Sequence, residues 1–336
     1  MRIALRLHGG LSARACVEQA GAAERAGLSA VWFAENPFNR GVLPAMAACA
    51  LTTSAIRIGI GVFNPFNRHP TLIAMEMGAL DELSGGRAML GIGAGIKVGQ
   101  IGLPFERPIA AVRDAIQIVR PLLRGEEVDY AGKVFSAAKV RLEFQPCRAG
   151  MPIFMAAVGD QALGLCGELA DGLMISNMCP PEYTRRAVGI VAGAAQRAGR
   201  PRVSAVVQYA PCAIEDDSAE ARRIAKVLVG AMLVAFWRGG RALPATQSAL
   251  RDYNGIEPEE FGRIMDRLTR GEPAETVLDD RLLDHYAVAG TPAQCLGRFD
   301  AYREAGVTEL ALWFAPDRSL EGIARLGELN FDRSAL

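Results

Sequence analysis

The sequence predicts a single α/β domain spanning residues 1–336, with the architecture of a (β/α)₈ TIM barrel and two insertions. Short apolar runs alternate with amphipathic helical segments, a pattern typical of parallel strands joined by helical crossovers. Eight such runs occur, and eight parallel strands close a barrel. The chain of 336 residues exceeds the roughly 250 of a typical barrel, and the surplus fits a hairpin near 126–144 and a helical insertion near 228–287. A doubly wound open sheet is the alternative architecture.

The expected strands are apolar runs rich in β-branched and aliphatic residues, bounded by polar or glycine-containing segments. In chain order they cover residues 2–8, 29–34, 56–62, 87–93, 151–157, 170–176, 203–210 and 308–315. Residues 128–144 have the aromatic and β-branched content of an extra hairpin. No linker-like segment or internal repeat divides the chain, which favours one domain.

The expected helices show apolar residues at steps of three and four and carry capping signals at their ends. They cover 12–26, 42–53, 70–83, a stripe from Ile109 to Leu123, a segment between the fifth and sixth strands, 216–228, 290–307, and a last stretch to about 329. Ser12 is placed to open the first helix. Asp217 with Glu220, and Thr291 with Gln294, have the spacing of capping boxes.

Composition excludes several classes of function. Lys plus Arg equals Asp plus Glu, and counterion-release binding to nucleic acid or anionic membranes needs a basic face. No run of about 18 apolar residues and no signal-peptide pattern occurs, so we expect a cytoplasmic protein. The seven cysteines have no C-x-x-C spacing and the three histidines are far apart, so we expect no metal site.

The glycine-rich stretch RAMLGIGAGIKVGQ, residues 87–100, tests whether the chain binds a dinucleotide in the Rossmann manner. That fingerprint needs a third glycine or alanine where Val98 stands, and an acid at a strand end about 20 residues on. The nearest acid at that distance is Asp114, inside a helical pattern. The stretch is therefore better interpreted as the exit of the fourth barrel strand, where missing side chains let a flat ligand approach the backbone.

In a TIM barrel the site lies at the carboxyl ends of the strands, which selects the residues that follow each run. The candidates are Arg6 and His8; Glu35 and Asn36; Gly61, Val62 and Asn64; Gly93 to Gly95; Ala156 to Gly159; Ser176 to Cys179; and Trp313.

Five segments in this order resemble the bacterial-luciferase-like superfamily of flavin and deazaflavin enzymes. They are SAVWFAENPFNRG, IGIGVFNPFNRHP, LDELSGGRAMLGIGAG, PIFMAAVGDQALGLCGELADG and GTPAQCLGRFDAYREAGVTEL. Within it, the chain most resembles coenzyme F420-dependent methylenetetrahydromethanopterin reductases, from about residue 2 to residue 315. The resemblance implies an F420-dependent oxidoreductase that transfers a hydride between C5 of the deazaflavin and a small organic substrate. One alternative is an FMN-dependent luciferase-like monooxygenase, and another is a catalytically idle homologue that binds cofactor.

The resemblance implies positions for the cofactor. A non-prolyl cis peptide behind the central ring falls at Gly61-Val62, with Asn64 beside it, although an ordinary trans strand exit is the alternative. Ala94 and Gly95 would contribute backbone beside the ring. The turn Ala156, Ala157, Val158 and Gly159, with the helix it opens, would receive the phosphate. A hydroxyl near that phosphate falls at Ser176, which could also be a solvated strand-end serine.

The sequence departs from the family at the positions that carry its chemistry. The Asp-His pair of many relatives is Glu35-Asn36 here, and Asn36 can donate and accept hydrogen bonds to the cofactor but cannot shuttle a proton. The acids of the reductases at the first and fourth strand ends are replaced by Arg6 and by Ile96 followed by Lys97. Arg6 would suit an anionic or carbonyl-bearing substrate. We expect Glu35, Asn36 and Arg6 to act on the substrate, although the first two could merely cap their loop.

The helices at 42–53 and 71–80 are more apolar than the exterior of a monomer requires. Family members pair through comparable helices, so the resemblance implies a homodimer. Packing against the late insertion is the alternative.

Overall fold

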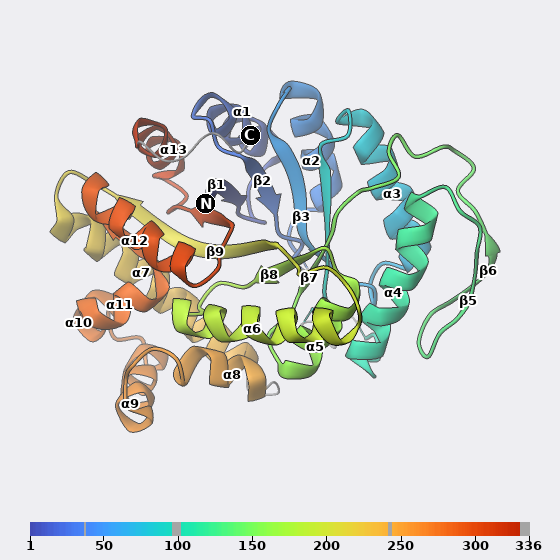
Figure 1. Cartoon of the computed structure of the whole chain (residues 1–336). Coiled ribbons are helices and arrows are strands. Elements are labelled where there is room, and N and C mark those ends of the chain that lie inside the picture. Colours follow the sequence, from blue (N-terminus) through green and yellow to red (C-terminus); the bar gives the residue numbers. More distant parts are fainter. Residues whose placement is uncertain (37, 96–101, 241–243, 330–336) are drawn as a thin grey trace.

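The computed structural model of the chain describes residues 1–36, 38–95, 102–240 and 244–329. Eight parallel strands form a barrel surrounded by helices (Figure 1). Around the barrel the strands are β1 (Arg2–Leu7), β2 (Ala30–Phe33), β3 (Arg57–Phe63), β4 (Ala88–Ile92), β7 (Ile153–Ala156), β8 (Gly172–Ile175), β9 (Ala205–Ile214) and β11 (Glu309–Trp313). Pairing of β8 with β9, in addition to the other neighbours, closes the ring. This confirms the predicted barrel and excludes the open sheet.

The barrel helices follow the strands in the alternation that the sequence predicts. They are α1 (Ala13–Arg25), α2 (Val42–Thr52), α3 (Pro70–Leu83), α4 (Pro108–Leu123), α5 (Asp160–Leu169), α6 (Pro181–Arg197), α7 (Ser218–Gly239), α12 (Pro292–Glu304) and α13 (Ser319–Glu328). Ser12 caps α1 by accepting from the backbone N–H of Ala15, and the capping box of Thr291 and Gln294 is formed at α12. None of the described helices is long and apolar enough to cross a membrane.

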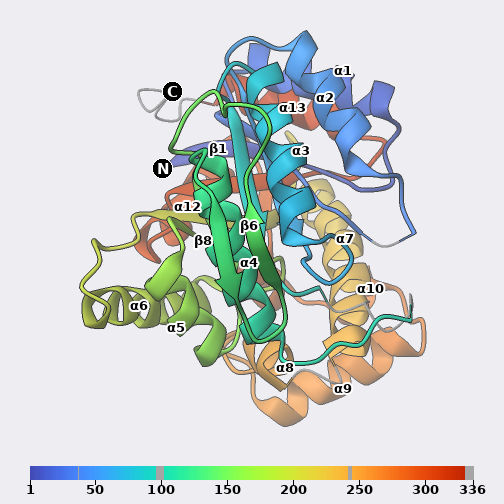
Figure 2. The same ribbon diagram turned by 90° about the vertical axis from the view of Figure 1, so that its right-hand side faces the viewer.

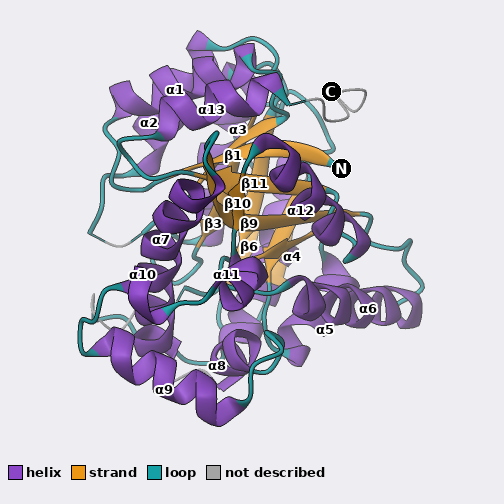
Figure 3. Ribbon diagram, turned by 90° about the vertical axis from the view of Figure 1, so that its left-hand side faces the viewer, coloured by secondary structure: helices purple, strands orange, loops and turns teal. Residues whose placement is uncertain are grey.

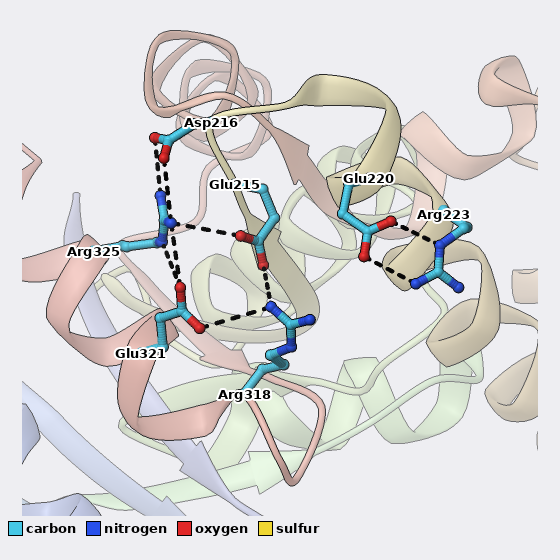
Figure 4. A network of polar contacts seen from close by, with 7 residues as sticks. All are labelled: Glu215, Asp216, Glu220, Arg223, Arg318, Glu321 and Arg325. Atoms are coloured by element: carbon cyan, nitrogen blue, oxygen red, sulfur yellow. Dashed lines mark hydrogen bonds and ion pairs between the residues drawn. The ribbon is translucent and has the colours of Figure 1, made fainter.

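The capping box predicted at Asp217 and Glu220 is wrong in its second half. Asp217 does cap α7, because its side chain accepts from the N–H of Ala219. Glu220 instead forms a two-pronged ion pair with Arg223, one turn along the same helix (Figure 4). A charged neighbour on the helix face is the stronger partner for this exposed carboxylate.

Helix α13 is held against the loop after β9 by a network of ion pairs (Figure 4). Arg325 contacts Glu215 and Asp216, with its Nη1 3.0 Å from an Asp216 carboxylate oxygen. Arg318 also reaches Glu215, at 3.5 Å. Since this loop extends β9 at the carboxyl end of the barrel, the network fixes the last helix beside that end.

The predicted hairpin is β5 (Val128–Ala131) paired antiparallel with β6 (Ser136–Val140). It lies along α4, as Figure 2 shows. Buried Asp114 on α4 joins the two, because its carboxylate accepts from Tyr130 Oη at 2.8 Å and from the N–H of Val134 at 2.7 Å. The acid considered for a ribose is therefore structural.

The predicted late insertion is helical, but its boundaries differ from those expected. Helix α7 continues to Gly239 instead of ending near 228, and α8 (Pro244–Arg251), α9 (Pro258–Thr269), α10 (Ala274–Val277) and α11 (Asp280–Tyr286) follow at one end of the molecule (Figure 3). They share a second hydrophobic cluster with α7. The seventh strand runs over Ala205–Ile214 instead of 203–210, and its extension pairs with a strand absent from the prediction, β10 (Val288–Gly290). Three residues are too short for strand periodicity to be recognised.

Strand alternation separates an outer from an inner face. Ile3, Leu5 and Leu7 of β1 pack outward in the main core with the helices. The strand residues that alternate with these point into the barrel, where they form a separate cluster that includes Ala4, Trp32, Phe154, Met174, Val207, Tyr209 and Ala311. Arg2 and Arg6 share the parity of Ala4, so they mark the amino and carboxyl ends of the interior.

The amino-terminal end of the interior is closed by Glu309. This fully buried carboxylate accepts from Trp32 Nε1 at 2.7 Å, from Ser29 Oγ at 3.0 Å and from Arg2 Nε at 3.1 Å, and it also pairs with Arg57. The donors come from β1 (Arg2), from β2 and the residue before it (Trp32 and Ser29), and from β3 (Arg57), while Glu309 belongs to β11. The network therefore locks four strands together and leaves the opposite end for chemistry.

Candidate functional site

The residues predicted for the site all lie in the last residues of barrel strands or directly after them, and we call this end the carboxyl rim. They belong to the ends of β1 (Arg6), β2 (Glu35, Asn36), β3 (Gly61, Val62, Asn64), β4 (Ala94, Gly95), β7 (Ala156, Ala157, Val158, Gly159) and β8 (Ser176). Because the eight strands are parallel and closed, these segments share one end of the barrel. Ile96 and Lys97 lie outside the described residues.

The peptide bond between Gly61 and Val62 is cis, at the position that the resemblance implies. The pairing register of β3 with β4 shifts between Ile60 and Phe63, so a bulge accompanies it. A Cβ added to Gly61 would overlap the hydroxyl of Tyr209 and lie 2.6 Å from Met174 Sδ. Glycine is required here because two interior side chains occupy its Cβ direction.

Glycines in β4 and directly after it accommodate the bulge. A Cβ on Gly91 would overlap the carbonyl oxygen of Ile60, and one on Gly93 would lie 3.1 Å from both Val62 Cγ2 and Ala156 Cβ. Beyond the strand, a Cβ on Gly95 would lie 2.9 Å from Asn64 Nδ2. The backbones of β3 and β4 thus approach closely around Val62, and together they form a ledge of small residues at the rim.

Asn64 is buried beside this ledge. Its Oδ1 accepts from the backbone N–H of Phe66 at 3.0 Å, so its primary role in the structure is to shape the loop after β3. Its amide nitrogen faces Gly95, on the neighbouring loop. Asn64 therefore connects the two segments proposed to flank the cofactor ring.

Arg6 lies between two aromatic side chains of the interior. Its guanidinium carbon is 5.5 Å from the Tyr209 ring centre and 5.7 Å from that of Trp313. Burial lowers the pKa of Arg6, and its Nε is buried without a hydrogen-bond partner among the described residues. Stacking on aromatic faces stabilises the cation but leaves its N–H edge unsatisfied.

Trp313 and His8 complete the surroundings of Arg6. Trp313 Nε1 donates to Oδ1 of buried Asn177 at 2.8 Å, which fixes the indole. Exposed His8 accepts from the N–H of Gly10 through Nδ1 at 3.0 Å. Burial, and then the charge of Arg6, lower the pKa of His8. His8 is therefore neutral near pH 7 and does not neutralise or repel an anion at Arg6.

Glu35 is held by an arginine that the sequence analysis did not identify. Arg68 Nη2 lies 2.8 Å from Glu35 Oε1, Arg68 Nη1 pairs with Glu76, and the guanidinium lies 4.5 Å from the Phe63 ring centre. Glu35 Oε2 is buried and has no partner among the described residues. One carboxylate oxygen is thus anchored and the other is available to a bound donor.

Asn36 follows Glu35 on the rim, close to the loop after β1. A Cβ on Gly9 would lie 2.8 Å from Asn36 Nδ2, and the carbonyl of Asn36 accepts from the N–H of Asn39 at 3.2 Å. Both segments after β2 and β3 read NPFNR, at 36–40 and 64–68, a five-residue repeat that the sequence analysis missed. The second copy supplies Arg68, and this repeated pattern is the signal that could have found it.

The turn from Ala156 to Gly159 leads directly into α5, whose first turn has no side-chain cap. The buried Tyr183 supports the turn by donating its hydroxyl to the carbonyl of Val158. Asp160 in the first turn would oppose an anion, but Arg186 pairs with it at 2.7 Å. Free N–H groups at a helix start, with a neutralised acid, fit a phosphate. Ser176, directly after β8, is half-buried.

Tyr209 is the interior residue that the sequence analysis missed. It lies between Arg6 and the ledge, and its hydroxyl is 3.5 Å from the carbonyl oxygen of Gly61. Burial raises its pKa, so it carries its proton at neutral pH. The alternation Ala205, Val207, Tyr209 places it on the inner face, which was the available signal.

The described residues contain no group of three or more His, Cys, Asp or Glu placed to hold a metal. The rim instead offers a backbone ledge, three buried polar atoms without partners among the described residues (Arg6 Nε, Glu35 Oε2 and Arg68 Nε), and a helix start suited to phosphate. These features fit a flat organic cofactor that carries a phosphate.

Comparison with known proteins agrees with this geometry. The family described as Luciferase-like monooxygenase matches residues 1–309. The chain is 33% identical over 298 residues to a 5,10-methylenetetrahydromethanopterin reductase of Archaeoglobus fulgidus, covering 86% of each chain. It is 31% identical over 295 residues to the enzyme of that name from Methanolobus tindarius, again covering 86% of each. The solved coenzyme F420 dependent tetrahydromethanopterin reductase from Methanopyrus kandleri superposes with a TM-score of 0.86 at 24% identity, covering 98% of this chain and 97% of that one.

Proposed function

Because this chain belongs to the luciferase-like monooxygenase family, we propose that it is a coenzyme F420-dependent oxidoreductase that acts on a small organic substrate. The observation that carries the proposal is the similarity to two 5,10-methylenetetrahydromethanopterin reductases across 86% of the chain, together with the fold shared with the coenzyme F420 dependent reductase from Methanopyrus kandleri. The bound deazaflavin would supply C5 as the carrier of the hydride.

The chain's own residues would bind and orient both reactants. The ledge at Gly61-Val62, with Ala94 and Gly95, would support the ring, and Asn36 and Asn64 would offer polar groups at its edges. The turn from Ala156 to Gly159, with Ser176, would hold the phosphate. Glu35, fixed through one oxygen by Arg68, would present its other oxygen to a donor on the substrate or the ring.

The same residues argue against methylenetetrahydromethanopterin as the substrate. Arg6 stands where the resemblance leads us to expect an acid, and its unpaired cation would oppose the role of that acid. Asn36 cannot deliver a proton. Tyr209, which retains its proton and lies beside the ledge, could donate one.

We also propose a single-domain, cytoplasmic homodimer. Leu51 on α2 is 70% exposed and Met75 on α3 is 50% exposed, and an apolar surface of this kind on adjacent helices is typical of an interface. All seven cysteines are free thiols, as expected for a reducing compartment. Sedimentation of the wild type and a Leu51→Glu variant tests the dimer, because the charge should shift the protein to monomer.

Binding of F420 and of FMN to the purified protein tests the cofactor, and oxidation of reduced F420 by candidate acceptors tests the reaction. Gly93→Ala, which presses on Val62 and Ala156, should weaken F420 binding about tenfold. Gly164→Ala is the matched control, since a Cβ there meets nothing within 4 Å. Preference for FMN would indicate a monooxygenase, and binding of neither would indicate an idle homologue.

A further inference from the structure

Three arginines share the inner face of the barrel, and they differ in how their charge is met. Arg2 and Arg57, at the amino-terminal end, both pair with buried Glu309. Arg6 lies four residues along β1 from Arg2, which is about 13 Å at the rise of a strand. No carboxylate contacts Arg6 in the described part of the chain, although a carboxylate was available to both of the others.

The surroundings of Arg6 leave one side of the guanidinium for a partner. Tyr209 and Trp313 contact it through their ring faces, and Asn177 holds the Trp313 ring in place. Neither aromatic side chain accepts the N–H of Nε, which is buried. A buried N–H without an acceptor is unfavourable, and a carboxylate bound along the edge of Nε and one Nη would satisfy it with two parallel hydrogen bonds.

The other charged groups of the rim are already engaged. Glu35 is paired with Arg68, and Arg68 is shared with Glu76. His8, whose pKa is lowered by burial and by the charge of Arg6, is neutral near pH 7. Arg6 is therefore an unneutralised cation at the described rim, next to the tyrosine that contacts the ledge.

We propose that Arg6 binds the carboxylate of the substrate, so that the protein acts on an organic carboxylate. This rests on the proposed F420-dependent function, because the carboxylate would anchor a substrate beside the ring on the ledge. A phosphoryl group shares the oxyanion chemistry, but the planar edge of an aromatic-stacked guanidinium matches a planar carboxylate best.

Calorimetric titration with benzoate, its neutral isostere benzamide and phenyl phosphate tests the proposal, with and without F420. The variants are Arg6→Met, which removes the charge, and Arg6→Lys, which keeps the charge but loses the planar fork. Arg14→Met is the matched control, since Arg14 is an exposed arginine on α1. Thermal unfolding of each variant establishes that it is folded, and F420 affinity is measured in each.

We expect the wild type and Arg14→Met to bind benzoate at least tenfold more tightly than benzamide or phenyl phosphate. Arg6→Met should lose this preference and Arg6→Lys should retain part of it, while F420 affinity changes less than twofold. The proposal is overturned if the wild type shows no preference, if phenyl phosphate binds best, if Arg6→Met keeps the preference, or if it loses F420 affinity in parallel. Failure of the wild type to bind F420 would instead refute the proposed function, because the titration without F420 still reports on Arg6.

Discussion

Replacing Arg68 by methionine should both destabilise the fold and release Glu35. The Arg68 side chain is 17% exposed, and those of its partners Glu35 and Glu76 are 14% and 23% exposed. The stability lost on breaking these ion pairs should therefore lie between the loss for a surface ion pair and the loss for a buried ion pair. Two kinds of contact would be lost: the ion pairs of Arg68 with Glu35 and Glu76, and its cation–π contact with Phe63.

The magnitude follows from those contacts. A charge-assisted hydrogen bond contributes about 1.5 kcal/mol at partly buried positions, and a cation–π contact contributes about 0.5–1 kcal/mol. Arg68→Met should therefore lower the free energy of unfolding by about 3.5–4 kcal/mol, a factor of roughly 500 in the unfolding constant. Arg68→Lys should lose about half as much, because one ammonium replaces a fork that spans two carboxylates.

Urea denaturation measures the stability change, and the rate of F420 turnover measures the position of Glu35. Turnover should fall about tenfold in Arg68→Met, since the carboxylate is no longer held at the rim. Arg14→Met supplies the control for loss of an exposed charge. The reasoning fails if Arg68→Met is no less stable than Arg14→Met, or if it is destabilised while turnover is unchanged.

Three further predictions concern both ends of the barrel. Glu309→Gln should lower the free energy of unfolding by about 3 kcal/mol, because it weakens four buried or half-buried hydrogen bonds, and F420 affinity should not change because the residue lies at the opposite end. Gly61→Ala should cost about 2–3 kcal/mol and abolish F420 binding, because the new methyl overlaps the hydroxyl of Tyr209. Burial and the charge of Arg6 lower the pKa of His8 from 6.5 in the folded state, so the folded protein binds this proton less tightly than the unfolded protein does. Stability should therefore fall as the pH drops below about 6.5. Arg6→Met should raise the pKa of His8 in an NMR titration.

Each of these predictions has a matched comparison. Glu18→Gln removes an exposed carboxylate, and equal destabilisation by Glu18→Gln and Glu309→Gln would contradict the network argument. Gly164→Ala adds a methyl group in open space, and equal loss of F420 binding there would contradict the clash at Gly61. An unchanged pKa of His8 in Arg6→Met would show that the two side chains do not interact.

Much of the barrel was predictable because its determinants are local. The strands are short apolar runs in which alternate residues face the helices, as Ile3, Leu5 and Leu7 of β1 do. Helical segments with recognisable end signals separate these runs. The exceptions are elements set by tertiary contacts. Strand β10 exists because the end of β9 extends beyond the barrel wall and offers it a partner. Glu220 does not complete the capping box, because its carboxylate pairs with Arg223 one turn along the helix.

The site was predictable in position but not in its contacts. Parallel strands fix which end of the barrel carries chemistry, and the resemblance placed the cis peptide at Gly61-Val62, where it is found. The pairing of Arg68 with Glu35 joins two loops whose relative distance no local pattern encodes. Tyr209 was missed for a different reason. The alternation of β9 places it on the inner face, but its contacts with Arg6 and Gly61 depend on how three strands are arranged around the closed barrel.

The contrast between the two ends of the barrel is the strongest structural argument for where the reaction takes place. At the amino-terminal end, Glu309 brings one buried carboxylate to Arg2, Arg57 and Trp32. At the carboxyl rim, Arg6 Nε and Glu35 Oε2 are buried and unmatched among the described residues. Both carboxylate oxygens of Glu309 are hydrogen-bonded at the end of the barrel that needs only stability. Unsatisfied polar atoms that persist at the opposite end cost free energy in the protein alone, and a bound ligand that supplies one acceptor and one donor would recover it.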